Sequence, residues 1–194
     1  PSALASRIFA GIVALLLIGT VSGLSGVPGT GLLFPATLLA LAAWLLKQDI
    51  ARRTVHQQGL TRFIAVCLLS GYVWLGIGAL ILLSAGGTMP DSAAYGAGLH
   101  AILLGFVFAM VFGHAPIIFP AILGVRLPYH SLFYLPLAVL HLSLALRVVG
   151  TLLGAAPMRS AGGALNAAAL ALFVLGLVVS MARGASDSAR SPSR

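Results

Sequence analysis

The sequence predicts an all-α fold, a polytopic bundle of about six transmembrane helices, and three observations lead to this prediction. Hydrophobic residues make up 60% of the 194 residues, and charged residues make up only 7%. A soluble domain carries roughly 25% charged residues. The apolar runs are about 20 residues long, which is the length a helix needs to cross the hydrocarbon core and about twice that of a barrel strand. Polar segments with glycine and proline separate the runs.

Six apolar runs are predicted to be the spans of one helical domain, which covers residues 1–182. The runs cover residues 5–25, 29–46, 62–86, 95–120, 131–154 and 162–182. We interpret the first run as a span rather than a signal peptide, because five more runs follow it. Residues 183–194 are polar and rich in serine, and we expect them to form a disordered cytoplasmic tail.

The segments between the runs contain the residues that end helices. In chain order they read SGVPGT, KQDIARRTVHQQG, GGTMPDS, GVRLPYH and AAPMRSAGG. Glycine and proline in these segments favour turns. Near the end of the fourth run, Pro116, Pro120 and Pro128 predict either a kink or a re-entrant segment.

The distribution of basic residues predicts the topology. The formal net charge is +8, and most of the basic residues fall on one side of the six spans: Arg7, Lys47, Arg52, Arg53, Arg62, Arg126, Arg183, Arg190 and Arg194. Arg159 falls on the other side, and Arg147 lies within a span. Because basic loops stay in the cytoplasm, we expect both termini there, with the protein in a bacterial inner membrane. The pattern favours membrane topology over nucleic-acid binding.

Two histidines stand fourteen residues apart in the fourth run, within GAGLHAILLGFVFAMVFGHAPIIFP. In an uninterrupted α-helix, His100 and His114 lie within about 40° of one face and about 21 Å apart along the axis. That distance is too long for one metal ion to bind both. Small residues, which let a neighbouring helix approach closely, occupy the opposite side: Gly98, Gly105, Ala109 and Gly113.

The fifth run adds further candidate residues. His130, Tyr134 and His141 share a helix face, because eleven residues return to within about 20°. Arg147 follows toward the outer side, as a candidate partner of a haem propionate or a snorkelling residue. His130 is otherwise an interfacial loop residue.

Histidine is costly within a membrane and tends to mark a functional site, although a single histidine often only hydrogen-bonds to a neighbouring helix. Neutral imidazole is also the commonest metal ligand. We therefore take His100, His114 and His141 as candidate ligands of haem b or copper. Met110, His130 and Tyr134 are additional candidates.

Several function classes lack their signature in this sequence. The chain contains no glutamate, and Asp49, Asp91 and Asp187 all lie in connections or in the tail. A proton-coupled transporter usually keeps a carboxylate within the membrane. No CxxCH motif, P-loop or GxGxxG at a strand–helix junction is present. The sequence assigns no catalytic residues, and it leaves open whether the protein is an enzyme.

Three segments resemble a known family: RFIAVCLLSGYVWLGIGALILL, LHAILLGFVFAMVFGH and LPLAVLHLSLALRVVG. Together they resemble the C-terminal half of NnrS-type membrane proteins, which are about twice as long as this chain. The matching positions are Gly71, Tyr72, Trp74, Leu75, His100, Ala101, Gly105, Met110, Gly113, His114, Leu146, Arg147 and Val148. The family often has a histidine where Leu69 and Ser70 stand here. The resemblance implies a haem- and copper-containing protein that takes part in the response to nitric oxide.

The leading hypothesis is therefore an NnrS-like haem- or metal-binding membrane protein that handles nitric oxide or redox stress. Two alternatives stay open. One is a small permease or channel subunit without a cofactor, whose histidines are structural or relay protons. The other is a membrane-embedded subunit of a larger respiratory complex. The expected partners are the lipid bilayer and a second copy or another membrane subunit, with no nucleic acid.

Overall fold

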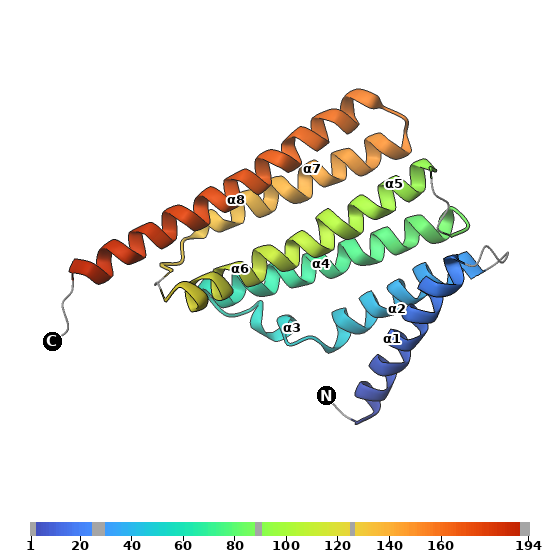
Figure 1. Ribbon diagram of the computed structural model, residues 1–194, viewed down its shortest axis with the longest axis horizontal. Coiled ribbons are helices and arrows are strands. Elements are labelled where there is room, and N and C mark those ends of the chain that lie inside the picture. The colour runs from blue at the N-terminus through green and yellow to red at the C-terminus, as the bar shows by residue number, and fades with distance from the viewer. Residues whose placement is uncertain (1–2, 25–29, 88–90, 125–126, 191–194) are drawn as a thin grey trace.

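The computed structural model describes residues 3–24, 30–87, 91–124 and 127–190, and these are helical apart from short turns (Figure 1). The α-helices are α1 (Ala3–Leu24), α2 (Leu33–Gln48), α3 (Ala51–Thr54), α4 (Gly59–Ser84), α5 (Ala93–His100), α6 (Phe108–Leu123), α7 (Tyr134–Leu152) and α8 (Ala156–Arg190). Two short 3-10 turns, η1 (Thr30–Leu32) and η3 (Ser131–Phe133), precede α2 and α7. The predicted all-α class is confirmed for the described residues.

Five helical segments of the described chain are long and apolar enough to cross a membrane: Ala3–Gly23, Gly59–Ser84, Ala93–Leu123, Ser131–Leu152 and Ala156–Gly184. They correspond to five of the six predicted runs. The run predicted at residues 29–46 forms α2, which has 16 residues and is shorter than the others. Near the C-terminus, α8 stays helical to Arg190, so it extends into residues 183–194, which were predicted to form a disordered tail.

The third of these segments is one continuous rod with an irregular middle. A π-helical stretch, η2 (Ala101–Val107), joins α5 to α6. Pro116 and Pro120 lie inside α6, and the helix continues past both until Gly124 adopts a left-handed conformation with φ 66°. Pro116 and Pro120 therefore do not break the helix, and proline is tolerated within a packed apolar helix.

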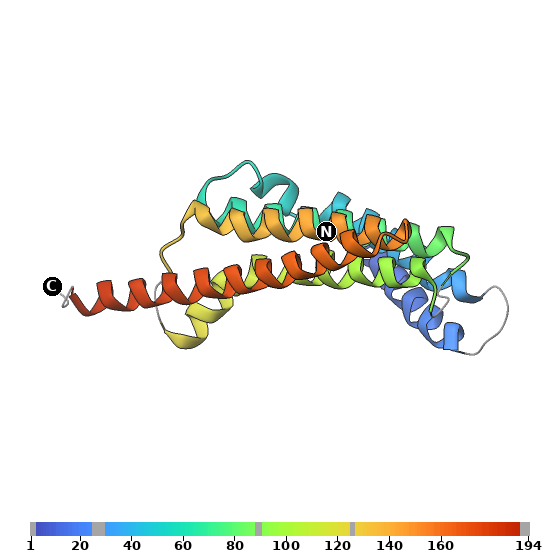
Figure 2. The ribbon, with the colours of Figure 1, turned by 90° about the horizontal axis from the view of Figure 1, so that it is seen from above.

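The helices form a bundle with an extension on one side. The rod of α5, η2 and α6 lies between α4 and α7, and α8 packs along α7 (Figure 1). Seen from above, α4 and α7 form one layer, and α6 and α8 form the other (Figure 2). Beyond α4 lies α2, and α1 contacts α2.

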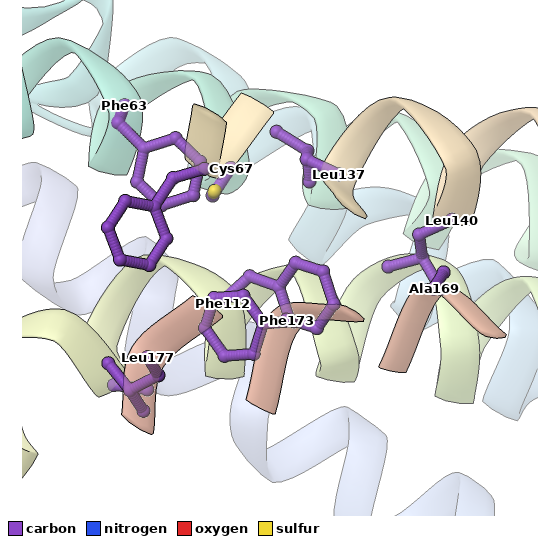
Figure 3. Close-up of a cluster of buried hydrophobic side chains, with 10 residues drawn as sticks. Phe63, Cys67, Phe112, Leu137, Leu140, Ala169, Phe173 and Leu177 are labelled. Carbon is purple, nitrogen blue, oxygen red and sulfur yellow. The ribbon is translucent and has the colours of Figure 1, made fainter. Parts of the chain in front are cut away.

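The core of the bundle is aromatic and well packed. Phe112 of α6 stacks on Phe173 of α8 with ring centroids 3.8 Å apart, and Phe63 of α4 lies 5.8 Å from Phe133 (Figure 3). The outward faces are apolar too, because Ile122 is 75% exposed and Leu142 is 73% exposed. Monomeric soluble proteins rarely expose large contiguous apolar surfaces, so this exterior is compatible with lipid contact.

Candidate functional site

A chain of hydrogen bonds crosses the centre of the bundle between α4 and α7. The indole N–H of Trp74 donates to Nδ1 of His141 at 2.9 Å. Because indole is only a donor, Nδ1 must be unprotonated, and neutral His141 carries its proton on Nε2. That nitrogen donates to Ser70 Oγ at 3.0 Å, and the Ser70 hydroxyl donates to the carbonyl of Cys67 at 3.1 Å. Neutral His141 is therefore fully satisfied inside an apolar bundle.

The π-helical segment provides the space for this chain. A Cβ atom on Gly105 would overlap the Cβ and Cγ atoms of Trp74 and would lie 2.9 Å from Cδ2 of Leu144. Glycine thus lets the indole lie directly against η2, where its ring is stacked with His141 at a centroid distance of 6.3 Å. π-Bulges are frequent at functional sites, and here the bulge lies against Trp74, the first donor of the hydrogen-bond chain.

The small residues that were predicted to allow close packing are buried: Gly98, Gly105, Ala109 and Gly113. The three glycines lie so close to α4 that a Cβ atom on any of them would contact a side chain of that helix. At Gly98 a Cβ would lie 2.8 Å from Leu82, and at Gly113 it would lie 3.1 Å from Cys67. Ala109 is fully buried as well. The expected packing face of the fourth run is therefore confirmed.

The prediction that His100 and His114 share one face assumed an uninterrupted α-helix, and the π-helical segment η2 lies between them. A π-bulge places about one extra residue in the turn, which rotates the following helix by about 100°. The residues between the histidines follow this rotation. Leu104 packs against the buried cluster around Leu144, whereas Val107 is exposed beside His114.

Both histidines nevertheless share one local geometry. His100 Nδ1 lies 2.6 Å from the Gly96 carbonyl, and His114 Nδ1 lies 2.7 Å from the Met110 carbonyl. A carbonyl only accepts, so Nδ1 carries the proton in each ring, and Nε2 holds the lone pair when the ring is neutral. Metal-binding histidines commonly donate their other ring N–H to a carbonyl in this way.

The two histidines differ in their surroundings. His100 is partly buried. His114 is exposed, and it lines an apolar groove of about 330 Å³ with Val107, Val111 and Phe119. Its neighbour Gly113 packs on Cys67, so His114 lies well inside the ends of the helices rather than in a loop.

Other predicted ligands lie elsewhere. His130 is exposed beside α8, and its Nδ1 accepts the backbone N–H of Leu132 at 3.3 Å. Tyr134 packs edge-on against Phe63 at 5.3 Å, and the Met110 side chain reaches Gly71. Within the described part of the chain, no group of three or more histidine, cysteine or acidic residues is placed to hold a metal ion.

These positions decide how the residues fit a haem or copper. His141 has no ring nitrogen left for a ligand bond while Trp74 and Ser70 hold it. His100 and His114 each offer one nitrogen, but they lie on either side of η2, fourteen residues apart. The described residues therefore do not fit a bis-histidine haem or a copper site built by one chain alone. His100 and His114 could each form one bond to a group that a residue from outside the described chain also holds.

Arg147 faces α8. Its backbone lies so close to Gly162 that a Cβ there would be 2.6 Å from the Arg147 nitrogen, and its guanidinium covers Gly163. Its Nε is buried with no hydrogen-bond partner among the described residues. Nearby, Asn166 is only 4% exposed and accepts a hydrogen bond from Ser143 at 2.6 Å, while its Nδ2 has no described partner.

The sequence interpretation did not identify Ser70 as a site residue, and it named Trp74 only as a position that matches NnrS-type proteins. The available signal was local. Ser70 and Trp74 are four residues apart, so they share a face of α4 in the middle of an apolar run. Their common partner on α7 is 67 residues further along the chain and is visible only in the fold.

Comparison with known proteins adds a family but no activity. The family described as Domain of unknown function (DUF8744) matches residues 1–182. No curated protein and no solved structure matches the chain.

Proposed function

The chain belongs to the family described as Domain of unknown function (DUF8744), and we propose that it is an integral membrane protein that binds haem b through His114. One observation carries this proposal. His114 is an exposed imidazole within the span-length segment Ala93–Leu123, with Nδ1 held by the Met110 carbonyl and Nε2 directed to no described partner.

An exposed histidine at this depth needs a partner from outside the chain. His114 lies nine residues, about 14 Å, before the end of its apolar segment. Ionisable residues within membranes almost always face the protein interior. The groove beside His114 is walled by Val111, Ile118 and Phe119, whose apolar surfaces suit a porphyrin face. A second copy or a partner subunit would provide the other residue that holds the haem.

A bound haem would supply redox chemistry and an iron centre for small ligands such as nitric oxide. A role in handling nitric oxide or redox stress rests on the resemblance of residues 60–180 to NnrS-type proteins. His100, with the same tautomer, is a second candidate ligand.

The membrane orientation is part of the proposal. Lys47 lies near the end of α2, Arg52 and Arg53 lie in α3, and Arg62 lies near the start of α4. These segments lie toward one end of the bundle, and the start of α8, which contains Arg159, lies at the opposite end (Figure 1). This asymmetry supports both termini in the cytoplasm of a bacterial inner membrane.

The absorption spectrum of the purified protein tests the proposal. We expect a Soret band that is lost in His114→Ala and retained in His56→Ala, whose histidine is exposed in the α3–α4 connection. Elemental analysis of the same preparation separates iron from copper. A colourless preparation that contains neither metal contradicts the proposal.

A second candidate function is a permease or channel subunit without a cofactor, in which His141 relays protons. The favouring observation is that Ser70, the hydrogen-bond acceptor of His141, also lines a groove of about 540 Å³ that contains Arg52 and His56. The polar chain thus reaches the basic side of the molecule.

Proton flux in proteoliposomes with an enclosed pH-sensitive dye tests this candidate. Ser70→Ala removes the link to the groove and should abolish the flux. Ser84→Ala is the control, because Ser84 donates to the Ile81 carbonyl of its own helix, at the far end of α4. Equal fluxes in protein-free and protein-containing vesicles would exclude the relay.

A further inference from the structure

The short α2 places a basic segment beside the bundle rather than beyond its end. The Tyr72 hydroxyl donates to Oδ2 of Asp49, the residue after α2, at 2.6 Å. Tyr72 stands thirteen residues, about 20 Å, after the start of α4. Even though its side chain leans toward that start, Asp49 lies alongside the middle of α4. The following helix, α3, therefore lies next to the first half of α4 (Figures 1 and 2).

A groove runs between this segment and α4. Arg52 and His56 line one wall, and Val66, Leu69 and Val73 of α4 line the other, within a volume of about 540 Å³. Val73 is 49% exposed, so the groove opens on the outward face of α4, which a bilayer would contact. The groove thus combines a cationic rim with an apolar wall.

The positive charge of this segment is only partly balanced by a protein carboxylate. Lys47, Arg52 and Arg53 stand close together in the sequence, and Asp49 is the acidic residue among them. Both Asp49 oxygens are engaged, one by Tyr72 and the other by the backbone N–H of Ala51 at 2.8 Å. No carboxylate lines the groove in the described structure. An arginine beside a membrane span needs an anionic partner.

We propose that this groove binds an anionic phospholipid, with its phosphate on Arg52 and His56 and an acyl chain along Leu69 and Val73. Guanidinium groups bind phosphate oxygens through paired charge-assisted hydrogen bonds. Basic clusters beside a transmembrane helix attract the anionic lipids of the cytoplasmic leaflet. The proposal rests on the membrane insertion proposed above and is independent of haem binding.

Native mass spectrometry of the full-length protein in detergent tests the site. The protein is titrated with phosphatidylglycerol, with phosphatidylcholine of the same acyl chains, and with inorganic phosphate. We expect one retained phosphatidylglycerol, weak retention of phosphatidylcholine, and no competition from inorganic phosphate. Arg52→Glu should lower phosphatidylglycerol occupancy at least about tenfold, because it removes a charged hydrogen-bond donor.

Two further variants make the result specific. Arg159→Glu carries the same charge change at the opposite end, where Arg159 is exposed, and should retain the lipid. Val73→Trp blocks the apolar wall and should weaken lipid binding while the basic residues stay. Circular dichroism of each variant checks that it is folded.

Three outcomes overturn the proposal: equal retention of both lipids, equal loss in both arginine variants, or displacement of the lipid by inorganic phosphate. Extraction of the protein from membranes by alkaline carbonate would instead refute membrane insertion. Absence of a Soret band would refute haem binding and leave the lipid site standing.

Discussion

Trp74 and Trp44 are the two tryptophans of the chain, and their indole nitrogens have different surroundings. Trp74 donates to His141, whereas the Trp44 nitrogen is buried without a hydrogen-bond partner among the described residues. Removing one partner of a buried hydrogen bond leaves the other unsatisfied. The two residues therefore form a matched pair for measuring what the hydrogen-bond chain contributes.

We expect Trp74→Phe to destabilise the protein by about 1–3 kcal/mol, because Nδ1 of His141 loses its donor. Trp44→Phe loses no hydrogen bond and should have a clearly smaller effect. Thermal unfolding in one detergent, followed by circular dichroism, measures both. Equal shifts in Tm would show that the hydrogen bond to His141 does not stabilise the fold.

Gly105 is the residue on which the position of Trp74 depends. Gly105→Ala places a methyl group inside the Trp74 side chain and should cost about 1–3 kcal/mol through overpacking. Gly176→Ala is the control, because a Cβ there has no neighbouring atom within 4 Å and alanine favours helix. The Tm of Gly105→Ala should fall while that of Gly176→Ala stays or rises. The reverse order would contradict the packing described for η2.

At the scale of elements, η2 has the character of an insertion in an otherwise α-helical rod. Small residues on both sides of it, Gly98 and Gly113, pack on α4, so the rod keeps its contact face through the bulge. The extra residue is absorbed locally. A deletion inside η2 should therefore remove the bulge without moving either end out of register.

Deleting Leu103, which is 52% exposed, should convert η2 to α-helix and leave a folded protein with a modest loss of Tm. Deleting Leu142, which is also exposed but lies within regular α7, should rotate one part of α7 by about 100° and prevent folding. Monodispersity and circular dichroism of both variants give the comparison. If both deletions prevent folding to the same extent, the packing of α5 and α6 on their neighbours requires the extra residue of η2.

The long apolar helices were predictable from the sequence, because each is an apolar run whose length matches the length that a helix needs to cross a membrane. Two elements were not. The place of α3 beside α4 goes with the Tyr72–Asp49 bond, which joins residues 23 positions apart. The π-helical turn has no periodicity of its own, so the sequence placed His100 and His114 on one face.

The candidate site was predictable as a set of residue types but not as an arrangement. His141 was expected as a ligand, and its two ring nitrogens are instead held by Trp74 and Ser70. That outcome follows from long-range packing around Gly105, where a missing side chain admits the indole. The fold therefore determines that both ring nitrogens of His141 form hydrogen bonds, whereas His114 is exposed.

At the scale of the whole molecule, the charge asymmetry and the lipid groove make one topological prediction. The α3–α4 connection should face the cytoplasm, and the start of α8 should face the opposite side. Cys67, the single cysteine of the chain, is fully buried in the core, so we expect it not to react in a thiol-labelling experiment. Gln57 and Ser160 are exposed, one near each end of the bundle, and they provide the reporter positions.

In spheroplasts, a membrane-impermeant maleimide should label Ser160→Cys and should label Gln57→Cys only after permeabilisation. The unsubstituted protein should stay unlabelled in both conditions, because a buried thiol is inaccessible and reacts poorly. Labelling of Gln57→Cys in intact spheroplasts would invert the topology. The basic groove would then face the outer leaflet, and the anionic lipids that we propose for it would lie on the wrong side of the membrane.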